Sequence, residues 1–270
     1  MTADLSPEHW LRRYRRPLGE PFARLICFPH ACGAASFYRS WAGLLPAGVD
    51  LFALQYPGHE DRFGEPCRQD VHGLAADVAS VLRAWAGPPV VLFGHSLGAA
   101  VAYEVACRLQ RSTVDLRGLL VSGRPAPHRA GRPPALGTDD ALWAELERLG
   151  GTNSSLLAER RLRNVFTPVL RADFEMNYRY EGTVSTLDCP IVAYRGADDD
   201  TARADAVAWW VELTRRDFGL VSFPGGHFYL VDQRDALVAE VGRRISALAA
   251  RGGPQRYSAV GSIPRPTAVG

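Results

Sequence analysis

Residues 94–98 read Gly-His-Ser-Leu-Gly, a spacing that can expose a serine hydroxyl as a nucleophile. The apolar run at 90–93 predicts a strand before them, and the alanine-rich stretch that follows predicts a helix. A serine at such a junction lies on a strained turn, so its neighbours need glycine, which has no Cβ to clash. The amides that open the helix favour negative charge near Ser96. The sequence therefore predicts a nucleophilic Ser96; the alternative is a serine in an ordinary strand-to-helix turn.

A serine hydroxyl attacks only when a base takes its proton and a third group orients that base. Chains built around such a turn usually place serine, acid and histidine in that order, and only His128 and His227 follow Ser96. His128 lies in a polar segment broken by prolines, whereas His227 follows the strand expected at 219–223. The carboxyl end of a sheet strand is where such a sheet keeps its site. We therefore expect His227 to be the base, against the alternative of a loop histidine with a local hydrogen-bonding role.

The acid is expected after the strand before that one, at residues 191–194. Three consecutive carboxylates follow this strand: Asp198, Asp199 and Asp200. Any of the three could orient the base, and one of them is expected only to hold the turn through side-chain to backbone hydrogen bonds.

An oxyanion that forms on the substrate needs two backbone N–H groups. One is expected from Leu97, the residue after the nucleophile, and the other from the loop after an early strand at 25–28. That loop is rich in small residues, and we expect Ala31 to supply its amide. His30 precedes Ser96 in the chain and lies in this loop, so a structural or substrate-contact role is favoured over catalysis.

Strands and helices alternate along most of the chain, which predicts the α/β class: a mostly parallel central sheet with helices on both faces. The expected strands are residues 25–28, 51–55, 90–93, 118–122, 191–194 and 219–223. The expected helices are residues 40–45, 71–85, 97–109, 204–215 and 237–248. Residues 1–20 are polar and arginine-rich, and we expect them to form a short leading segment on the core.

The alternation breaks at about residues 125–187, where an inserted helical lid beside the site is expected. One helix is predicted from Asp139–Asp140 through Leu149, and two more near 154–165 and 169–180. Five lid side chains could line an acyl channel or could pack the lid onto the core: Phe166, Leu170, Phe174, Met176 and Tyr180.

Four stretches together resemble a known family: Phe-Pro-His-Ala at 28–31, Tyr-Pro-Gly-His-Glu-Asp-Arg at 56–62, Gly-His-Ser-Leu-Gly-Ala at 94–99 and Pro-Gly-Gly-His-Phe at 224–228. In order and spacing they are similar to the type II, stand-alone thioesterases of polyketide synthase and nonribosomal peptide synthetase systems, in the α/β-hydrolase superfamily. The resemblance covers about residues 20–250. It is far more specific than the serine motif alone.

The resemblance implies an α/β-hydrolase fold and a serine thioesterase that removes aberrant or stalled acyl groups from the phosphopantetheine arm of acyl or peptidyl carrier domains. No cofactor of its own is implied, because the substrate carries the phosphopantetheine. The common Gly-x-x-Asp turn of these hydrolases selects Asp199, with Asp198 as the second candidate. The family usually has two glycines after Ala31, but this chain has Cys32 and Gly33. The thiol could narrow the loop or shift the Ala31 amide, or the replacement could be silent.

The amino-acid composition excludes several other classes of protein function. The 270 residues carry a formal net charge of +2, with no concentrated basic face for nucleic acid. No lysine occurs, which excludes a Ser-Lys dyad, a pyridoxal Schiff base and a Walker lysine. Five cysteines without a C-x-x-C pair, no secretory leader, no membrane-spanning run and no metal-ligand spacing predict a cytoplasmic protein. We expect a monomer with one domain over residues 1–250 and a flexible tail at 251–270.

Rival functions share these residues. A carboxylesterase, a lipase or an acyltransferase would use the same Ser96, Asp199 and His227, and Cys32 is an alternative nucleophile, although no base follows it in the expected geometry. A carrier-docking protein with an idle site is the alternative from another class. Relative rates on oxygen esters and thioesters, and the nature of the product, would separate them.

Overall fold

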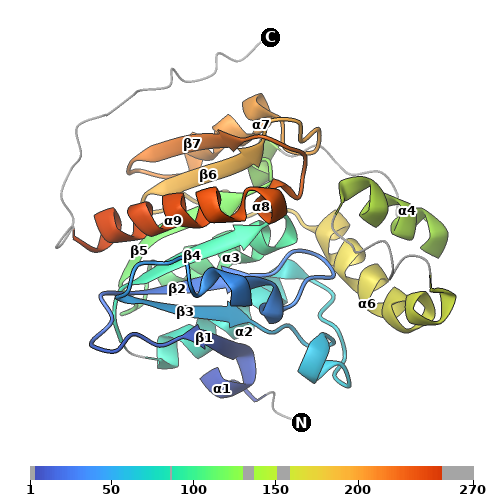
Figure 1. Cartoon of the computed structure of the whole chain (residues 1–270), viewed down its shortest axis with the longest axis horizontal. Coiled ribbons are helices and arrows are strands. Elements are labelled where there is room, and N and C mark those ends of the chain that lie inside the picture. The colour runs from blue at the N-terminus through green and yellow to red at the C-terminus, as the bar shows by residue number, and fades with distance from the viewer. Residues whose placement is uncertain (1–3, 86, 130–136, 151–158, 251–270) are drawn as a thin grey trace.

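The computed structural model describes residues 4–85, 87–129, 137–150 and 159–250, so the expected tail at 251–270 lies outside the described residues. Its centre is a seven-stranded sheet of order β1-β3-β2-β4-β5-β6-β7 (Figure 1). Only β1 is antiparallel to its neighbour. The strands are β1 (Leu11–Arg15), β2 (Ala23–Phe28), β3 (Val49–Leu54), β4 (Val90–His95), β5 (Leu116–Ser122), β6 (Ile191–Gly196) and β7 (Phe218–Phe223). The prediction of a mostly parallel α/β sheet is confirmed, and each of the six expected strands is present.

Helices cover both faces of the sheet, and each face has its own buried apolar cluster. Helices α2 (Val71–Ala84) and α3 (Leu97–Leu109) pack on one face, while α9 (Arg234–Ala249) and the 3₁₀ helix η1 (Ala35–Trp41) pack on the other (Figure 1). β3 and β4 are buried along their whole length because both of their faces are covered. Shorter helical pieces are α1 (Pro7–Trp10), η2 (Glu60–Arg62), η3 (Pro127–Arg129) and α8 (Tyr229–Asp232).

The predictions for three other segments are wrong in detail. The leading segment contributes β1, an edge strand of the sheet, rather than only packing on the core. The helix expected at 40–45 is replaced by η1, which begins earlier. The helix expected at 204–215 is split into α7 (Ala204–Ala208) and the 3₁₀ helix η4 (Trp209–Leu213).

The segment between β5 and β6 forms helices beside the carboxyl edge of the sheet. The predicted helix at 139–149 is confirmed as α4 (Asp139–Leu149), whose N-cap Thr138 accepts a hydrogen bond from Ala141 N–H. The helices expected at 154–165 and 169–180 are instead one helix, α6 (Arg160–Arg179), which runs through Pro168; residues 154–158 lie outside the described part. Pro168 removes one helical hydrogen bond, yet α6 continues through it. α4 and α6 form a lid to one side of the sheet (Figure 1).

The parallel register brings the carboxyl ends of several strands to one level. Phe28 of β2 pairs with Gly94 of β4, and Gly196 of β6 pairs with Phe223 of β7. Segments far apart in the chain therefore leave the sheet side by side. The candidate site is built from the loops that follow these positions.

Candidate active site

The predicted nucleophile occupies a strained turn between β4 and α3. Ser96 has φ 53° and ψ −116°, a conformation that a non-glycine residue rarely adopts. Sterics explain the glycines: a Cβ on Gly94 would lie 2.2 Å from the carbonyl oxygen of Gly98, and a Cβ on Gly98 would lie 2.1 Å from that of Phe28. The fold therefore turns sharply at Ser96 and directs it to the carboxyl edge of the sheet.

Among the three consecutive carboxylates, one is paired with the predicted base. Asp199 Oδ2 lies 2.8 Å from Nδ1 of His227, and both side chains are buried. Asp198 and Asp200 are exposed. Burial by itself would raise the pKa of Asp199, but hydrogen bonds and charge from His227, together with hydrogen bonds from Thr201, outweigh it and lower the pKa. An ionised Asp199 accepts the Nδ1 proton and leaves Nε2 of His227 free to act as a base.

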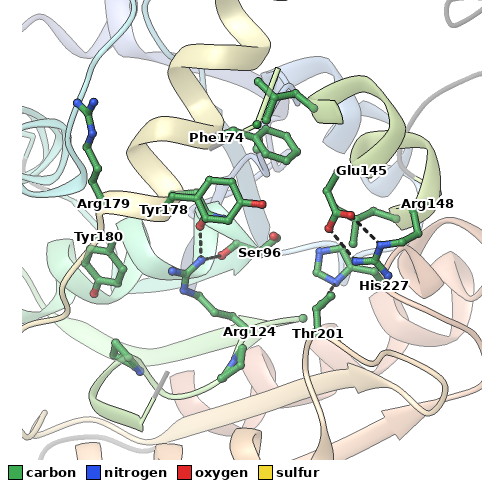
Figure 2. A pocket seen from close by; sticks show the side chains of 18 of the residues that line it. Ser96, Arg124, Glu145, Arg148, Phe174, Tyr178, Arg179, Tyr180, Thr201 and His227 are labelled. Atoms are coloured by element: carbon green, nitrogen blue, oxygen red, sulfur yellow. Dashed lines mark hydrogen bonds and ion pairs between the residues drawn. The ribbon is translucent and has the colours of Figure 1, made fainter. Parts of the chain in front are cut away.

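Thr201 belongs to this arrangement, although it was not among the predicted site residues. Its N–H and its hydroxyl both donate to Asp199 Oδ1, at 2.9 and 2.6 Å. Its oxygen also lies 3.0 Å from His227 Nδ1 and accepts from it (Figure 2). The spacing of Asp199 and Thr201 could have predicted this contact, because an aspartate commonly accepts a hydrogen bond from the backbone N–H two residues later.

The other histidines considered in the sequence have different surroundings. His128 lies on η3, where its Nε2 pairs with Glu212 at 2.7 Å. His30 is buried against Phe37 and Phe228. Burial, followed by the charges of His227 and His59, lowers the pKa of His30 to about 3, which keeps it neutral. A structural role for His30 is the better account.

The two predicted oxyanion donors lie where the loop after β2 meets the start of α3. Leu97 is the first residue of α3, so its N–H belongs to the open end of the helix. Ala31 follows β2 by three residues and lines the same cavity as Ser96 and His227. Burial, followed by the charge of Asp173, raises the pKa of the Cys32 thiol well above its ordinary value. A thiol in that state is a poor nucleophile, which argues against Cys32 in that role.

A cavity of about 1190 Å³ opens between these loops and the lid. Figure 2 shows Ser96, Thr201 and His227 on its core side, with Glu145 and Arg148 of α4 and Phe174 of α6 on its lid side. Of the five apolar lid residues considered, Phe174 and Tyr180 line it. Leu170 and Met176 are buried elsewhere, and Phe166 is exposed beside Phe63. Those three therefore do not form an acyl channel in this cavity.

The cavity has a polar inner end. Arg124 donates through Nη1 to Asn177 Oδ1 at 2.6 Å and to the Ser96 carbonyl oxygen at 3.4 Å (Figure 2). Its guanidinium lies 5.2 Å from the ring centroid of Tyr180. It forms no ion pair with a carboxylate of the described residues. Glu145 and Arg148, in contrast, neutralise each other through two hydrogen bonds of 2.7 Å.

The described ranges contain neither a candidate metal site nor a candidate membrane span. No three side chains among the described His, Cys, Asp and Glu residues gather as a metal site would require. None of the helices that the structure describes combines the length and the apolar character needed to cross a membrane.

Comparison with known proteins gives one consistent result. Residues 23–245 match the family model described as a thioesterase domain. The chain is 38% identical over 249 residues to "Thioesterase PikA5" of Streptomyces venezuelae, which covers 91% of this chain and 88% of the relative. The solved type II thioesterase BorB from the borrelidin biosynthetic cluster superposes with a TM-score of 0.81 at 38% identity, over 91% of this chain and 99% of that one. The RedJ thioesterase from the prodiginine pathway of Streptomyces coelicolor has a TM-score of 0.75 at 35% identity, over 84% and 89%.

Proposed function

Since the chain belongs to the thioesterase family and has the α/β-hydrolase fold, we propose that it hydrolyses acyl thioesters held on the phosphopantetheine arm of carrier domains. It acts in polyketide or nonribosomal peptide assembly, as its relatives do, and releases aberrant or stalled acyl groups. Acyl and peptidyl carrier domains are its partners in this proposal, and the protein is a cytoplasmic monomer. The names of the relatives support this proposal: PikA5 is named a thioesterase, and RedJ is a thioesterase from the prodiginine biosynthetic pathway.

One observation carries the chemistry: the buried 2.8 Å pair of Asp199 and His227 beside the strained Ser96. In the proposed reaction His227 Nε2 takes the hydroxyl proton as Ser96 Oγ attacks the thioester carbonyl. The Leu97 and Ala31 amides stabilise the oxyanion, an effect of about 3 kcal/mol per donor in comparable sites. The C–S bond breaks, the thiol leaves with the proton from His227, and an acyl ester of Ser96 remains.

Deacylation repeats the same steps with water as the nucleophile. His227 removes a proton from water, the hydroxide attacks the ester of Ser96, and the serine regains its proton as the free acid departs. Asp199 holds the imidazole in the tautomer that accepts at Nε2 and stabilises the imidazolium that forms. The proposed chemistry uses no metal and no cofactor of the protein's own.

The test is Ser96→Ala with a panel of acyl carrier proteins. Wild type should release free acid and show an acyl adduct on Ser96 by intact mass, whereas Ser96→Ala should lose both and keep its melting temperature. Ser80→Ala is the matched control, because Ser80 lies on α2 and its hydroxyl bonds only to Ala76 O within that helix. Wild-type turnover by Ser96→Ala would refute the proposal. Faster cleavage of matched oxygen esters than of thioesters would favour an esterase instead.

A further inference from the structure

The lid helix α6 contacts the loop that carries the proposed oxyanion donor Ala31. Asp173 on α6 lies 1% exposed against this loop, although the two segments are far apart in the chain. We infer that Asp173 is a positioning residue: it holds the Ala31 amide in place for the oxyanion without touching the reacting atoms. The inference rests on the proposed function, because an oxyanion hole matters only where Ser96 attacks a carbonyl.

The loop after β2 makes a tight turn that its sequence does not favour. The N–H of Gly33 donates to the carbonyl oxygen of His30 at 2.9 Å, which closes a four-residue turn with Ala31 and Cys32 at its centre. Cys32 has φ 62°, in the left-handed region that turns of this kind usually fill with glycine. A side chain is strained there. The turn therefore needs support from outside, and relaxation of the turn would move Ala31 relative to Ser96.

Asp173 supplies that support through the backbone of the strained residue. Its Oδ2 accepts from Cys32 N–H at 2.6 Å. The bond is part-buried and charge-assisted, and the charge makes it stronger than a neutral one. It fixes the peptide group between Ala31 and Cys32, which would rotate if the strain were released. This peptide is next to the one that carries the Ala31 N–H, so its rotation would displace that donor.

His59 holds the carboxylate of Asp173 in position. Its Nε2 lies 2.9 Å from the same Oδ2 of Asp173, and its Nδ1 lies 3.1 Å from the carbonyl oxygen of Pro57. A carbonyl only accepts, so Nδ1 carries a proton, and a carboxylate at Nε2 requires a second one. Burial would lower the pKa of His59, but the charge and hydrogen bond of Asp173 outweigh it and raise the pKa. The imidazolium and the carboxylate therefore form a buried pair behind the turn.

Apolar packing from the lid acts on the same turn. α4 and α6 share a small core made of Leu142, Trp143, Leu146, Leu170 and Phe174. Ala31 and Cys32 pack against this core. Both the hydrogen bond and the packing thus come from the lid, so the oxyanion turn has its full support only while the lid helix is seated.

The experiment compares Asp173→Asn and Asp173→Glu with wild type on one short acyl thioester of a carrier protein. The first variant keeps an oxygen but loses the charge, and the second keeps the charge but moves it by one methylene. We expect kcat to fall about 10- to 100-fold with KM within threefold, because an oxyanion donor acts in the transition state. Affinity for an alkyl boronate that adds to Ser96 should fall by a similar factor. Glu175→Gln is the control and should match wild type, because Glu175 lies on the same helix but pairs with Arg171 and Arg179 of that helix.

Rescue by glycine separates positioning from a general structural role. Cys32→Gly removes the strain at φ 62°, so Asp173→Asn with Cys32→Gly should return kcat to within threefold of Cys32→Gly alone. The inference is overturned if Asp173 variants retain wild-type kcat, if only KM changes, or if the loss persists in the glycine background. Should neither single variant fold, the Cys32→Gly background decides: a double variant that does not fold also overturns the inference.

The behaviour of wild type distinguishes failure of the proposed thioesterase function from failure of the proposed role of Asp173. Wild type that neither forms acyl-Ser96 nor releases acid refutes the proposed function itself. Wild type that does both, with Asp173 variants that equal it in kcat, refutes only the role of Asp173.

Discussion

Replacement of Asp199 by asparagine tests the triad at the point where the structure makes the sharpest prediction. An amide at this position has an oxygen on one side and an NH₂ group on the other. The N–H and hydroxyl of Thr201 both donate to the Oδ1 position, so the amide oxygen is held there. The NH₂ group then faces His227 Nδ1. Because Nδ1 must accept from it, the imidazole proton moves to Nε2, and the ring cannot take the proton of Ser96.

The fall in kcat for Asp199→Asn follows from the free-energy cost of restoring the tautomer in which His227 Nε2 accepts a proton. The amide would have to turn its oxygen to His227, which takes the acceptor away from the part-buried N–H of Thr201, at a cost of about 0.5–1.5 kcal/mol for the lost hydrogen bond. The imidazolium in the transition state would also lose a charged partner for a neutral one, about 1.5–2 kcal/mol. Together these give about 2–3.5 kcal/mol, which corresponds to a fall in kcat of about 30- to 400-fold.

The assay is release of free acid from an acyl carrier protein, with the acyl-Ser96 adduct followed by intact mass. Asp198→Asn and Asp200→Asn are matched controls, because both side chains are exposed neighbours. They should stay within twofold of wild type. An Asp199→Asn protein within tenfold of wild type, or an Asp198→Asn protein as impaired as Asp199→Asn, would refute the assignment of the acid.

The same variant makes a second prediction about stability. The pKa of Asp199 in the folded protein is below its ordinary value of 3.8, so its ionised form stabilises the fold above that pH. The stabilisation is lost as the pH falls through the folded-state pKa. The difference in unfolding free energy between wild type and Asp199→Asn should therefore be largest near neutral pH and shrink below about pH 3.8, measured by urea unfolding.

Two further substitutions test the scaffold of the site. Gly98→Ala places a Cβ 2.1 Å from the carbonyl oxygen of Phe28, a backbone clash that no rotamer relieves, so we expect kcat to fall more than about 100-fold. Gly43→Ala is the control and should leave kcat unchanged, because the space around its Cβ is open. Equal kcat for the two variants would contradict the steric argument. Glu104→Gln should destabilise the fold by about 3 kcal/mol in denaturant unfolding near neutral pH, because the buried carboxylate accepts from the N–H and the hydroxyl of Thr183. Burial would raise the pKa of Glu104, but these bonds outweigh it and lower the pKa. The difference in unfolding free energy between wild type and Glu104→Gln should therefore shrink only below about pH 4.5. A difference under about 0.5 kcal/mol near neutral pH would contradict the reasoning.

The sheet could be predicted well because its parallel strands are buried on both faces. A strand such as β4 needs apolar side chains at nearly every position, which is a strong signal in the sequence. β1 carries no such signal, since three of its five residues are arginine. At a sheet edge these side chains can reach partners beyond the strand: Arg13 pairs with the buried Asp50 at 2.6 Å, and Arg15 donates to backbone carbonyls. An arginine-rich leading segment and a polar edge strand have the same sequence pattern, so they can be told apart only once the partner strand is known.

Some residues of the site could be predicted from the nearby sequence, whereas others depend on contacts between segments far apart in the chain. Chain order and local turn chemistry were enough to select Ser96, His227 and a group of three carboxylates. Burial of Asp199 alone, with Asp198 and Asp200 exposed, depends on how the turn after β6 folds back on β7. The residues by themselves therefore left all three open, and only the Gly-x-x-Asp turn of the resembled family favoured Asp199. Asp173 lies 141 residues from Cys32, so its contact is purely tertiary and left no trace in the sequence pattern.

The strand register explains why few local motifs could locate so much of the site. Phe28 is level with Gly94, and Gly196 is level with Phe223. Ala31, Ser96, Asp199 and His227 each follow one of these positions by no more than four residues. Residues that leave parallel strands at a common level must meet at that edge, so the sheet alone brings the reacting groups together. The sheet does not determine which way the Ala31–Cys32 peptide faces, because the turn has already left it. That orientation depends on Asp173, and the lid is therefore the element whose position should govern transition-state stabilisation rather than substrate capture alone.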